Sequence, residues 1–220
     1  MSGMSKTPTN GLVTIDDDFT FSLENFCVPF CYKRDLDSVL VPEGLIKDRV
    51  WRLAEQLHLE IGDNPVSALC VLKGSYRFFT DLTKALSVFR AQCAHPITVD
   101  FIQLKSYSDM GSTGKVEVIG GNPLSDLQNQ HVLIVEDLVD TGLTMQRLLE
   151  MLKEHQPATV RVVCLFRKRR QDCTYWPHFT GFSIPDRFVV GYGLDYNQKF
   201  RDLNHICVMN QQGIDKYKST

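Results

Sequence analysis

The sequence predicts an α/β fold, with a central, mostly parallel sheet flanked by helices. Two segments, residues 67–89 and 132–152, each join a continuous apolar run to a short turn and then to a helical pattern. Apolar runs bounded by turn residues are typical of strands buried on both faces, as in a parallel sheet. Further strand patterns alternate with the helical ones, and this alternation also favours an α/β domain.

Each element is expected from its own pattern. Helices are predicted where apolar residues recur every three to four positions, and strands where apolar residues run together or alternate. In chain order we expect an irregular aromatic segment (11–42), a helix (45–57), a strand (67–72), a helix (76–89), a strand (97–104), a mobile polar loop (105–114), a return strand (116–119), a strand (132–135), a helix from 145, and strands at 159–166, 188–192 and 205–209.

Length and composition limit the class of protein. A chain of 220 residues fits one domain, and a domain of this size buries roughly 70% of its unfolded surface, so it needs no disulfide. The formal net charge of −2 argues against a general nucleic-acid binder, which usually has a strongly basic face. No apolar run reaches the ~18 residues of a membrane span. We therefore expect neither a nucleic acid nor a membrane as a partner.

Cysteine usage and the N-terminus indicate the compartment. Residues 1–10 lack the apolar core of a signal peptide and are expected to be a flexible start. The seven cysteines are odd in number, and Cys70, Cys164 and Cys207 lie inside apolar runs, where a free thiol behaves as a small buried hydrophobe. Both features favour a reducing compartment, and we expect a cytoplasmic protein.

The stretch 132–145 carries the most chemistry. Its apolar run is followed by the carboxylates Glu136, Asp137 and Asp140, and then by Thr141, Gly142 and Thr144 before a helix. Open α/β sheets bind ligands at the carboxyl ends of their strands. Main-chain N–H groups at the start of a helix favour an anion, so residues 140–144 form a candidate phosphate cradle. The motif G-x-x-x-x-G-K-[ST] is absent, which excludes a nucleoside-triphosphate P-loop.

Three acids beside a phosphate cradle suit a ligand that carries more than phosphate. A carboxylate pair accepts two hydrogen bonds from a sugar diol, and a divalent cation can join the acids, the diol and a second phosphate. A phosphorylated ribose has all these groups. Asp140 would then lie near the anomeric carbon, as a proton acceptor or as a stabiliser of an oxocarbenium-like transition state. The alternative is that Glu136 and Asp137 only cap the helix and solvate a turn.

Several segments carry a family resemblance. Residues 135–144 (VEDLVDTGLT) resemble the phosphoribosyl pyrophosphate (PRPP) motif of type I phosphoribosyltransferases. Residues 71–75 (VLKGS), 99–107 (VDFIQLKSY), 188–197 (FVVGYGLDYN) and 200–205 (FRDLNH) resemble segments of the hypoxanthine-guanine branch, in its order and close to its spacing. The similarity runs from about Leu36 to the C-terminus.

The resemblance implies a fold and an activity. The fold would be that of type I phosphoribosyltransferases, as a single domain over 11–220 whose small hood comes from roughly 11–40 and 170–220. The enzyme would be a magnesium-dependent purine salvage transferase. It would convert PRPP and hypoxanthine or guanine into IMP or GMP and pyrophosphate, and it would form a homodimer or homotetramer.

The resemblance also implies roles in binding ribose and 5′-phosphate. Glu136 and Asp137 would hold the ribose hydroxyls and a Mg2+ ion, and Asp195 would bind a second Mg2+. Asp140 would be the general base near purine N7. The 5′-phosphate would lie in a cradle made by Asp140, Thr141, Gly142, Leu143 and Thr144.

Two further sets are implied for pyrophosphate and for the purine. Pyrophosphate would meet Lys73, Gly74, Ser106, Tyr107 and Arg201, with Lys73 and Gly74 in a turn that contains a non-proline cis peptide, and with Ser106 and Tyr107 opening a loop that closes over the site. The purine would meet Leu138, Lys168, Phe188, Val189 and Asp195. The lysine that contacts the 6-oxo group is ambiguous, because spacing from the acidic turn gives Lys168 and spacing from Phe188 gives Arg167. We choose Lys168, since the strand before it matches without a gap.

Two residues depart from the family pattern. Leu143 stands where the family usually has lysine, and Ser75 stands where it has a second glycine. Because main-chain amides do most of the phosphate binding, we expect weakened rather than lost affinity at Leu143. These departures leave open a weakly active or regulatory nucleotide-binding paralogue. The one-residue ambiguity at Lys168 leaves open an enzyme with a narrowed or shifted purine preference.

Overall fold

The computed structural model describes residues 11–106, 116–119 and 122–218. The predicted flexible N-terminus (1–10), Tyr107 and most of the predicted mobile loop lie outside the described residues. The strands are β1 (Val13–Thr14), β2 (Leu36–Val41), β3 (Val66–Leu72), β4 (Ile97–Ser106), β5 (Val116–Ile119), β6 (His131–Val139), β7 (Thr159–Lys168), β8 (Phe179–Ile184), β9 (Val189–Val190) and β10 (Ile206–Met209). The helices are α1 (Glu43–Ile61), α2 (Tyr76–Phe89), α3 (Leu143–Glu154) and α4 (Gln211–Tyr217), with short 3-10 turns η1 (Leu23–Asn25) and η2 (Leu124–Leu127).

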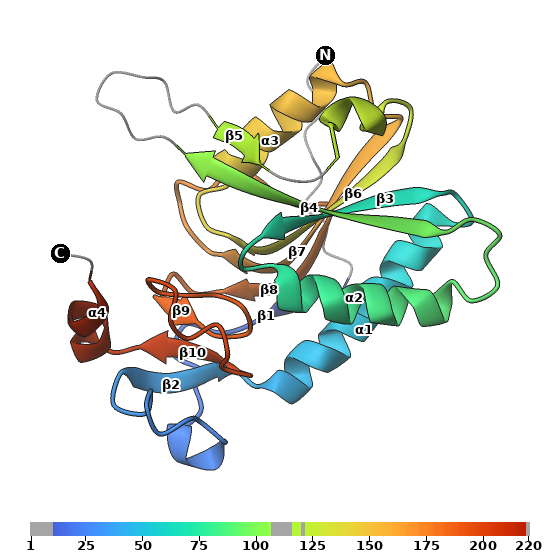
Figure 1. Ribbon diagram of the computed structural model, residues 1–220. Coiled ribbons are helices and arrows are strands. Elements are labelled where there is room, and N and C mark those ends of the chain that lie inside the picture. The colour runs from blue at the N-terminus through green and yellow to red at the C-terminus, as the bar shows by residue number, and fades with distance from the viewer. Residues whose placement is uncertain (1–10, 107–115, 120–121, 219–220) are drawn as a thin grey trace, which may run out of the picture.

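A seven-stranded sheet forms the body, in the order β1-β8-β7-β6-β3-β4-β5. Neighbouring strands are parallel except for β4 and β5, which pair antiparallel. Helices α1 and α2 pack on one face, and α3 packs on the other (Figure 1). The expected fold class, a mostly parallel sheet flanked by helices, is confirmed.

Apolar periodicity explains why these elements form. On α2 the buried positions follow helical spacing, with Phe78, Phe79, Leu82, Ala85 and Leu86 turned to the sheet. On β6 the run 132–135 is buried at every position, as a central parallel strand requires. Burying one such large side chain contributes about 1.5–3 kcal/mol. The core clusters on the two faces of the sheet contain many of them.

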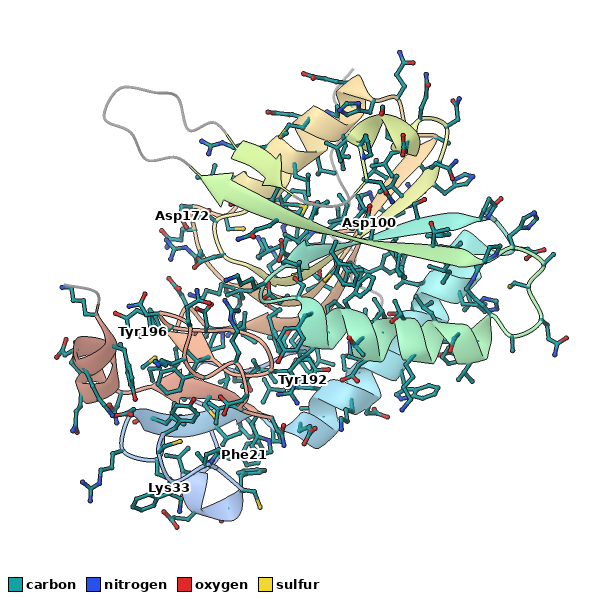
Figure 2. All side chains as sticks on the ribbon, viewed as in Figure 1. Phe21, Lys33, Asp100, Asp172, Tyr192 and Tyr196 are labelled. Atoms are coloured by element: carbon teal, nitrogen blue, oxygen red, sulfur yellow. The ribbon has the colours of Figure 1, made fainter. Side chains whose placement is uncertain are left out.

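A second, three-stranded sheet in the order β2-β10-β9 joins distant parts of the chain. Figure 1 shows it beside α4, away from the far edge of the large sheet at β5. Buried Asp35 accepts hydrogen bonds from Lys216 Nζ (2.8 Å) and Tyr217 Oη (3.0 Å), which fixes α4 to the start of β2. Tyr192, labelled in Figure 2, links this sheet to α2 because its hydroxyl donates to Asp81.

The proposed hood boundaries remain a prediction. The small sheet does combine N-terminal and C-terminal segments, but the ranges 11–40 and 170–220 also contain β1 and β8, which belong to the large sheet. Within the described residues, no helix is both long and apolar enough to cross a membrane.

Several elements differ from the sequence prediction. Residues 11–42 are not wholly irregular, because they contain β1 and β2, and the sequence also missed β8 and α4. The strand expected over 188–192 is only the two-residue β9. The main strands run further than their apolar cores: β6 continues through both acids to Val139, and β7 continues to Lys168. Backbone pairing causes this, since Glu136 lies opposite Cys164 and Val139 opposite Arg167.

Candidate active site

The candidate site lies where three adjacent parallel strands end. Strands β3, β6 and β7 are neighbours, and their carboxyl ends bring together the turn 73–75, the loop 140–142 and the residues after Lys168. Parallel strands place their carboxyl ends at one edge of the sheet, so these segments meet although they are far apart in sequence. Figure 2 shows Asp172, from the loop after β7, on the same side of the molecule as Tyr196, from the segment after β9.

The two adjacent acids are tied to the turn after β3. Ser75 is fully buried, and its hydroxyl donates to Glu136 Oε1 (3.2 Å) and accepts from the main-chain N of Asp137 (2.9 Å). Asp137 Oδ1 accepts from the main-chain N of Leu138 (2.8 Å). Glu136 and Asp137 are therefore strand residues with fixed carboxylates, and the alternative that they only solvate a turn does not describe their contacts.

Burial changes the acidity of this pair. Desolvation raises the pKa of the Glu136 carboxyl well above its usual range, and the adjacent charge of Asp137 raises it further. Desolvation also raises the pKa of Asp137, while hydrogen bonds to Glu136 and to the main-chain N of Leu138 act against that rise. A pair of this kind gains from a cation or from hydroxyl donors, because either one stabilises the charged form.

Asp140 and Lys168 face each other across the ends of β6 and β7. Lys168 Nζ donates to Asp140 Oδ2 (3.2 Å) and lies 3.5 Å from Asp186 Oδ1. Arg170 Nε lies 3.2 Å from Asp140 Oδ1, yet in the described part of the chain that buried oxygen accepts no hydrogen bond. Each oxygen of Asp140 thus faces a cation, but only Oδ2 accepts a hydrogen bond from one.

The loop after Asp140 leads into α3. Gly142 is the N-cap, with φ +81°, a backbone conformation that L side chains rarely adopt. No side chain caps this helix, although Thr141 Oγ1 accepts from the main-chain N of Leu143 at 3.4 Å. The other first-turn N–H groups are left available for an anion. The Leu143 side chain is exposed, as is Thr144.

The residues expected to bind pyrophosphate form two adjoining groups. The peptide bond between Leu72 and Lys73 is cis. A Cβ on Gly74 would lie 1.7 Å from Asp137 Oδ2, so any other residue there would force the Asp137 carboxylate to move. Arg201 donates to the main-chain O of Gly193 (2.7 Å) and pairs with Asp195 (2.8 Å).

The groups of Gly74 and Arg201 meet directly. A Cβ on Gly193 would lie 2.2 Å from the main-chain O of Gly74, which places the segment after β9 against the turn after β3. Lys73 Nζ reaches Gln198 Oε1 at 3.4 Å. Ser106 ends β4, and its predicted partner in the mobile loop, Tyr107, lies outside the described residues.

The residues expected to bind the purine come from two segments. Phe188 is 40% exposed, and its ring packs edge-on against Tyr196 at 4.8 Å. Val189 is buried and pairs with Val208 on β10. A half-exposed aromatic ring next to a buried strand offers a flat surface on which a base can stack.

The carboxylates of the site could help to hold a metal ion. Among the described residues, no three His, Cys, Asp or Glu side chains gather closely enough to hold a metal ion by themselves. Magnesium commonly uses one or two carboxylates and takes its other ligands from substrate phosphates and water. The adjacent carboxylates of Glu136 and Asp137 fit that pattern, and Asp195 would act separately.

Comparisons with known proteins agree with this geometry. The profile described as "Phosphoribosyl transferase domain" matches residues 40–197. The hypoxanthine-guanine phosphoribosyltransferase of Canis lupus familiaris is 50% identical over 97% of this chain and 99% of its own length. The one of Homo sapiens is 49% identical with the same coverage. This chain belongs to the hypoxanthine-guanine phosphoribosyltransferase family.

A solved structure extends the comparison to the fold. The hypoxanthine-guanine phosphoribosyltransferase of Schistosoma mansoni, determined in complex with IMP, matches with a TM-score of 0.79 and 36% identity, over 94% of this chain and 99% of that one. The family resemblance, the type I phosphoribosyltransferase fold and the assignment to purine salvage enzymes are confirmed at this level. The role of each site residue stays a prediction.

Some residues at the candidate site were not predicted from the sequence. Asp186 and Arg170 belong to the charged group around Asp140, and Arg167, which had been the alternative to Lys168, turns to the segment 173–176 instead. Spacing alone could not reveal Asp186, because it follows β8 and reaches Lys168 only in space. Arg170 lay inside the basic run 167–170, whose composition gives no direction to any one side chain.

Proposed function

We propose that this enzyme transfers the 5-phosphoribosyl group of PRPP to a 6-oxopurine, hypoxanthine or guanine, and releases IMP or GMP with pyrophosphate. The observation that carries the proposal is the arrangement at Asp140. One carboxylate oxygen accepts a hydrogen bond from Lys168. The other is buried 3.2 Å from Arg170 Nε without a hydrogen bond, and the start of α3 follows directly.

The sugar phosphate would occupy the end of β6. Glu136 and Asp137 accept the hydrogen bonds of the two ribose hydroxyls. The 5′-phosphate accepts hydrogen bonds from main-chain N–H groups at the start of α3 and from the hydroxyls of Thr141 and Thr144. Gly142 allows the left-handed backbone conformation of this loop. The dipole of α3 contributes about 0.3–1 kcal/mol to this anion, in addition to the hydrogen bonds.

The base would lie between Phe188 and the Asp140–Lys168 pair. Lys168 donates to the 6-oxo group, and Phe188 stacks on the ring. Leu138 packs at the edge, and Val189 reads the purine edge through its main-chain groups. Asp140 accepts the proton of N7 as the bond from N9 to the anomeric carbon forms.

Pyrophosphate would leave on the opposite side of the ribose. Lys73, Gly74 and Arg201 supply donors, with Ser106 and Tyr107 closing from the loop after β4. Glu136 and Asp137 would hold one Mg2+ together with substrate oxygens, and Asp195 would hold a second. When bound, magnesium would neutralise part of the negative charge on the leaving pyrophosphate.

Assembly and location belong to the same proposal. We expect a homodimer or homotetramer in the cytoplasm. Support for the cytoplasm comes from the seven free cysteines, of which Cys70, Cys164, Cys173 and Cys207 are buried.

A comparison of substrates tests the proposed function. Purified enzyme with PRPP and magnesium should form nucleoside monophosphate from hypoxanthine and guanine, and xanthine serves as the third base. Activity on xanthine alone would show a shifted purine preference. Nucleotide binding in calorimetry without any product would mean a regulatory paralogue and would overturn the enzymatic proposal.

A further inference from the structure

Arg167 is a buried cation that bonds to main chain rather than to an acid. Only 4% of it is exposed. Its Nε donates to the main-chain O of Tyr175 (3.0 Å), its Nη2 to that of Cys173 (2.9 Å) and its Nη1 to that of Lys168 (3.4 Å). The guanidinium also stacks on Trp176, 3.7 Å from the ring centre. Because hydrogen bonds from charged donors are stronger than neutral ones, these contacts make Arg167 the main anchor of the segment 173–176.

The anchored segment forms the wall behind the phosphate cradle. A Cβ on Gly142 would lie 2.6 Å from Tyr175 Cβ and 3.6 Å from Cys173 Sγ, so both residues press directly on the N-cap of α3. Tyr175 also packs in the core cluster below α3, but its buried hydroxyl has no hydrogen-bond partner among the described residues. Side-chain packing and main-chain hydrogen bonds both hold this wall, and Arg167 supplies two of the hydrogen bonds.

The adjacent residues Arg167 and Lys168 at the end of β7 contact two different parts of the site. Lys168 contacts Asp140 and Asp186, whereas Arg167 reaches the wall behind Gly142. We propose that Arg167 is a positioning residue for the 5′-phosphate: through the segment 173–176 it holds the Gly142 loop in the shape that directs the first N–H groups of α3 at the phosphate. This inference rests on the proposed function for the location of the phosphate.

The chain offers a matched control in Arg49. It is 5% exposed and also donates to two main-chain carbonyls, those of Gly181 (3.0 Å) and Thr180 (3.1 Å). It belongs to α1, which covers the face of the sheet opposite α3. Removing either arginine takes a buried guanidinium away from backbone carbonyls, but only Arg167 touches the wall of the cradle.

The experiment measures the dissociation constants of GMP and of guanosine, which lacks the phosphate, for the wild type, Arg167→Met, Arg167→Lys and Arg49→Met. Arg167→Met should weaken GMP about tenfold, as expected for one misdirected amide contact, and should change guanosine less than twofold. Arg167→Lys should rescue only part of the loss, because an ammonium cannot replace the fork. Arg49→Met should leave both ligands unchanged even where its melting temperature falls.

Three results would overturn the inference. These are unchanged GMP affinity in Arg167→Met, an equal loss of GMP and guanosine, or the same selective loss in Arg49→Met. If Arg167→Met does not fold, Trp176→Leu replaces it, and a GMP loss of about threefold with guanosine unchanged is then required. If the wild type binds GMP better than guanosine but makes no product, the proposed function fails while the inference about Arg167 stands.

Discussion

Lys168 Nζ lies 3.2 Å from Asp140 Oδ2, and this contact joins the proposed base-reading lysine to the proposed general base. Lys168 is the last residue of β7, and Asp140 directly follows β6, the parallel neighbour of β7. Lys168 also lies 3.5 Å from Asp186, so in the proposed mechanism this acid would remain as its second anionic partner. The cation can turn to the 6-oxo group of the base without losing all of its charge compensation.

Removing this amine should affect the base far more than PRPP. For Lys168→Met, loss of a charged hydrogen bond predicts a rise in KM for guanine of about 10–100-fold, with KM for PRPP within twofold of the wild type. Steady-state kinetics with each substrate varied in turn provides the measurement. Arg169→Met is the control, because Arg169 bonds to Ser183 and Ile15 rather than to Asp140. Equal rises in both KM values would contradict the assignment.

Ser75 should matter for stability through its hydroxyl. In Ser75→Ala, Glu136 Oε1 loses one of its two donors and the main-chain N of Asp137 loses one of its two acceptors, so the free energy of unfolding should fall by about 1–2 kcal/mol. Urea unfolding gives this value directly. The control is Ser87→Ala, since the Ser87 hydroxyl bonds only to the main-chain O of Lys84 on the exposed side of α2. A fall of the same size in both variants would mean that the buried position of Ser75 is irrelevant.

Replacing Leu143 by lysine should strengthen the binding of PRPP. The side chain is 54% exposed at the first residue of α3, so a lysine there would reach solvent near the proposed 5′-phosphate site. Leu143→Lys should lower KM for PRPP roughly two- to tenfold at low salt, and the gain should shrink as salt rises. Leu59→Lys adds the same charge on α1, at a side chain that is 74% exposed, and should change nothing. An unchanged KM in Leu143→Lys would show that backbone amides alone determine phosphate affinity.

His205 should make stability depend on pH. Its Nδ1 accepts from the main-chain N of Glu43 (3.0 Å), and burial lowers the pKa of its ring. Because the unfolded chain then binds a proton more readily than the folded one, stability is fully present above the unfolded pKa of about 6.5 and is lost as pH falls below it.

The variant His205→Asn separates this contribution from all others. Its amide oxygen can accept the same N–H but does not titrate in this range. The difference in free energy of unfolding between the wild type and His205→Asn should therefore drift in favour of the variant between pH 7 and pH 5. A constant difference across that range would refute the linkage.

The central strands could be predicted from sequence because their apolar runs leave little choice. Strand β6 is buried at 132–135, and β3 has the same character, so both were found. Strand β8 was missed because its buried residues include Thr180, Gly181 and Ser183, which read as a loop by composition. What buries β8 is its place between β1 and β7, which no local pattern contains.

The site was predictable only in part, for a similar reason. The acids and Gly142 lie within one short stretch, so their shared location followed from the sequence. The end of β6 could not be predicted from the sequence, because pairing with β7 extends the strand beyond Glu136 and Asp137. The partners Asp186 and Arg170, and the turn of Arg167 towards Cys173 and Tyr175, depend on long-range packing.

The most direct test of the whole account is the turnover of Asp140→Asn. Asparagine keeps the size of the side chain and an oxygen for Lys168 but cannot take a proton at that position. If Asp140 is the general base, kcat for GMP formation should fall by roughly 10²–10⁴-fold, while GMP binding in calorimetry stays near that of the wild type. Near-normal kcat in this variant would contradict the role of Asp140 and the mechanism built on it.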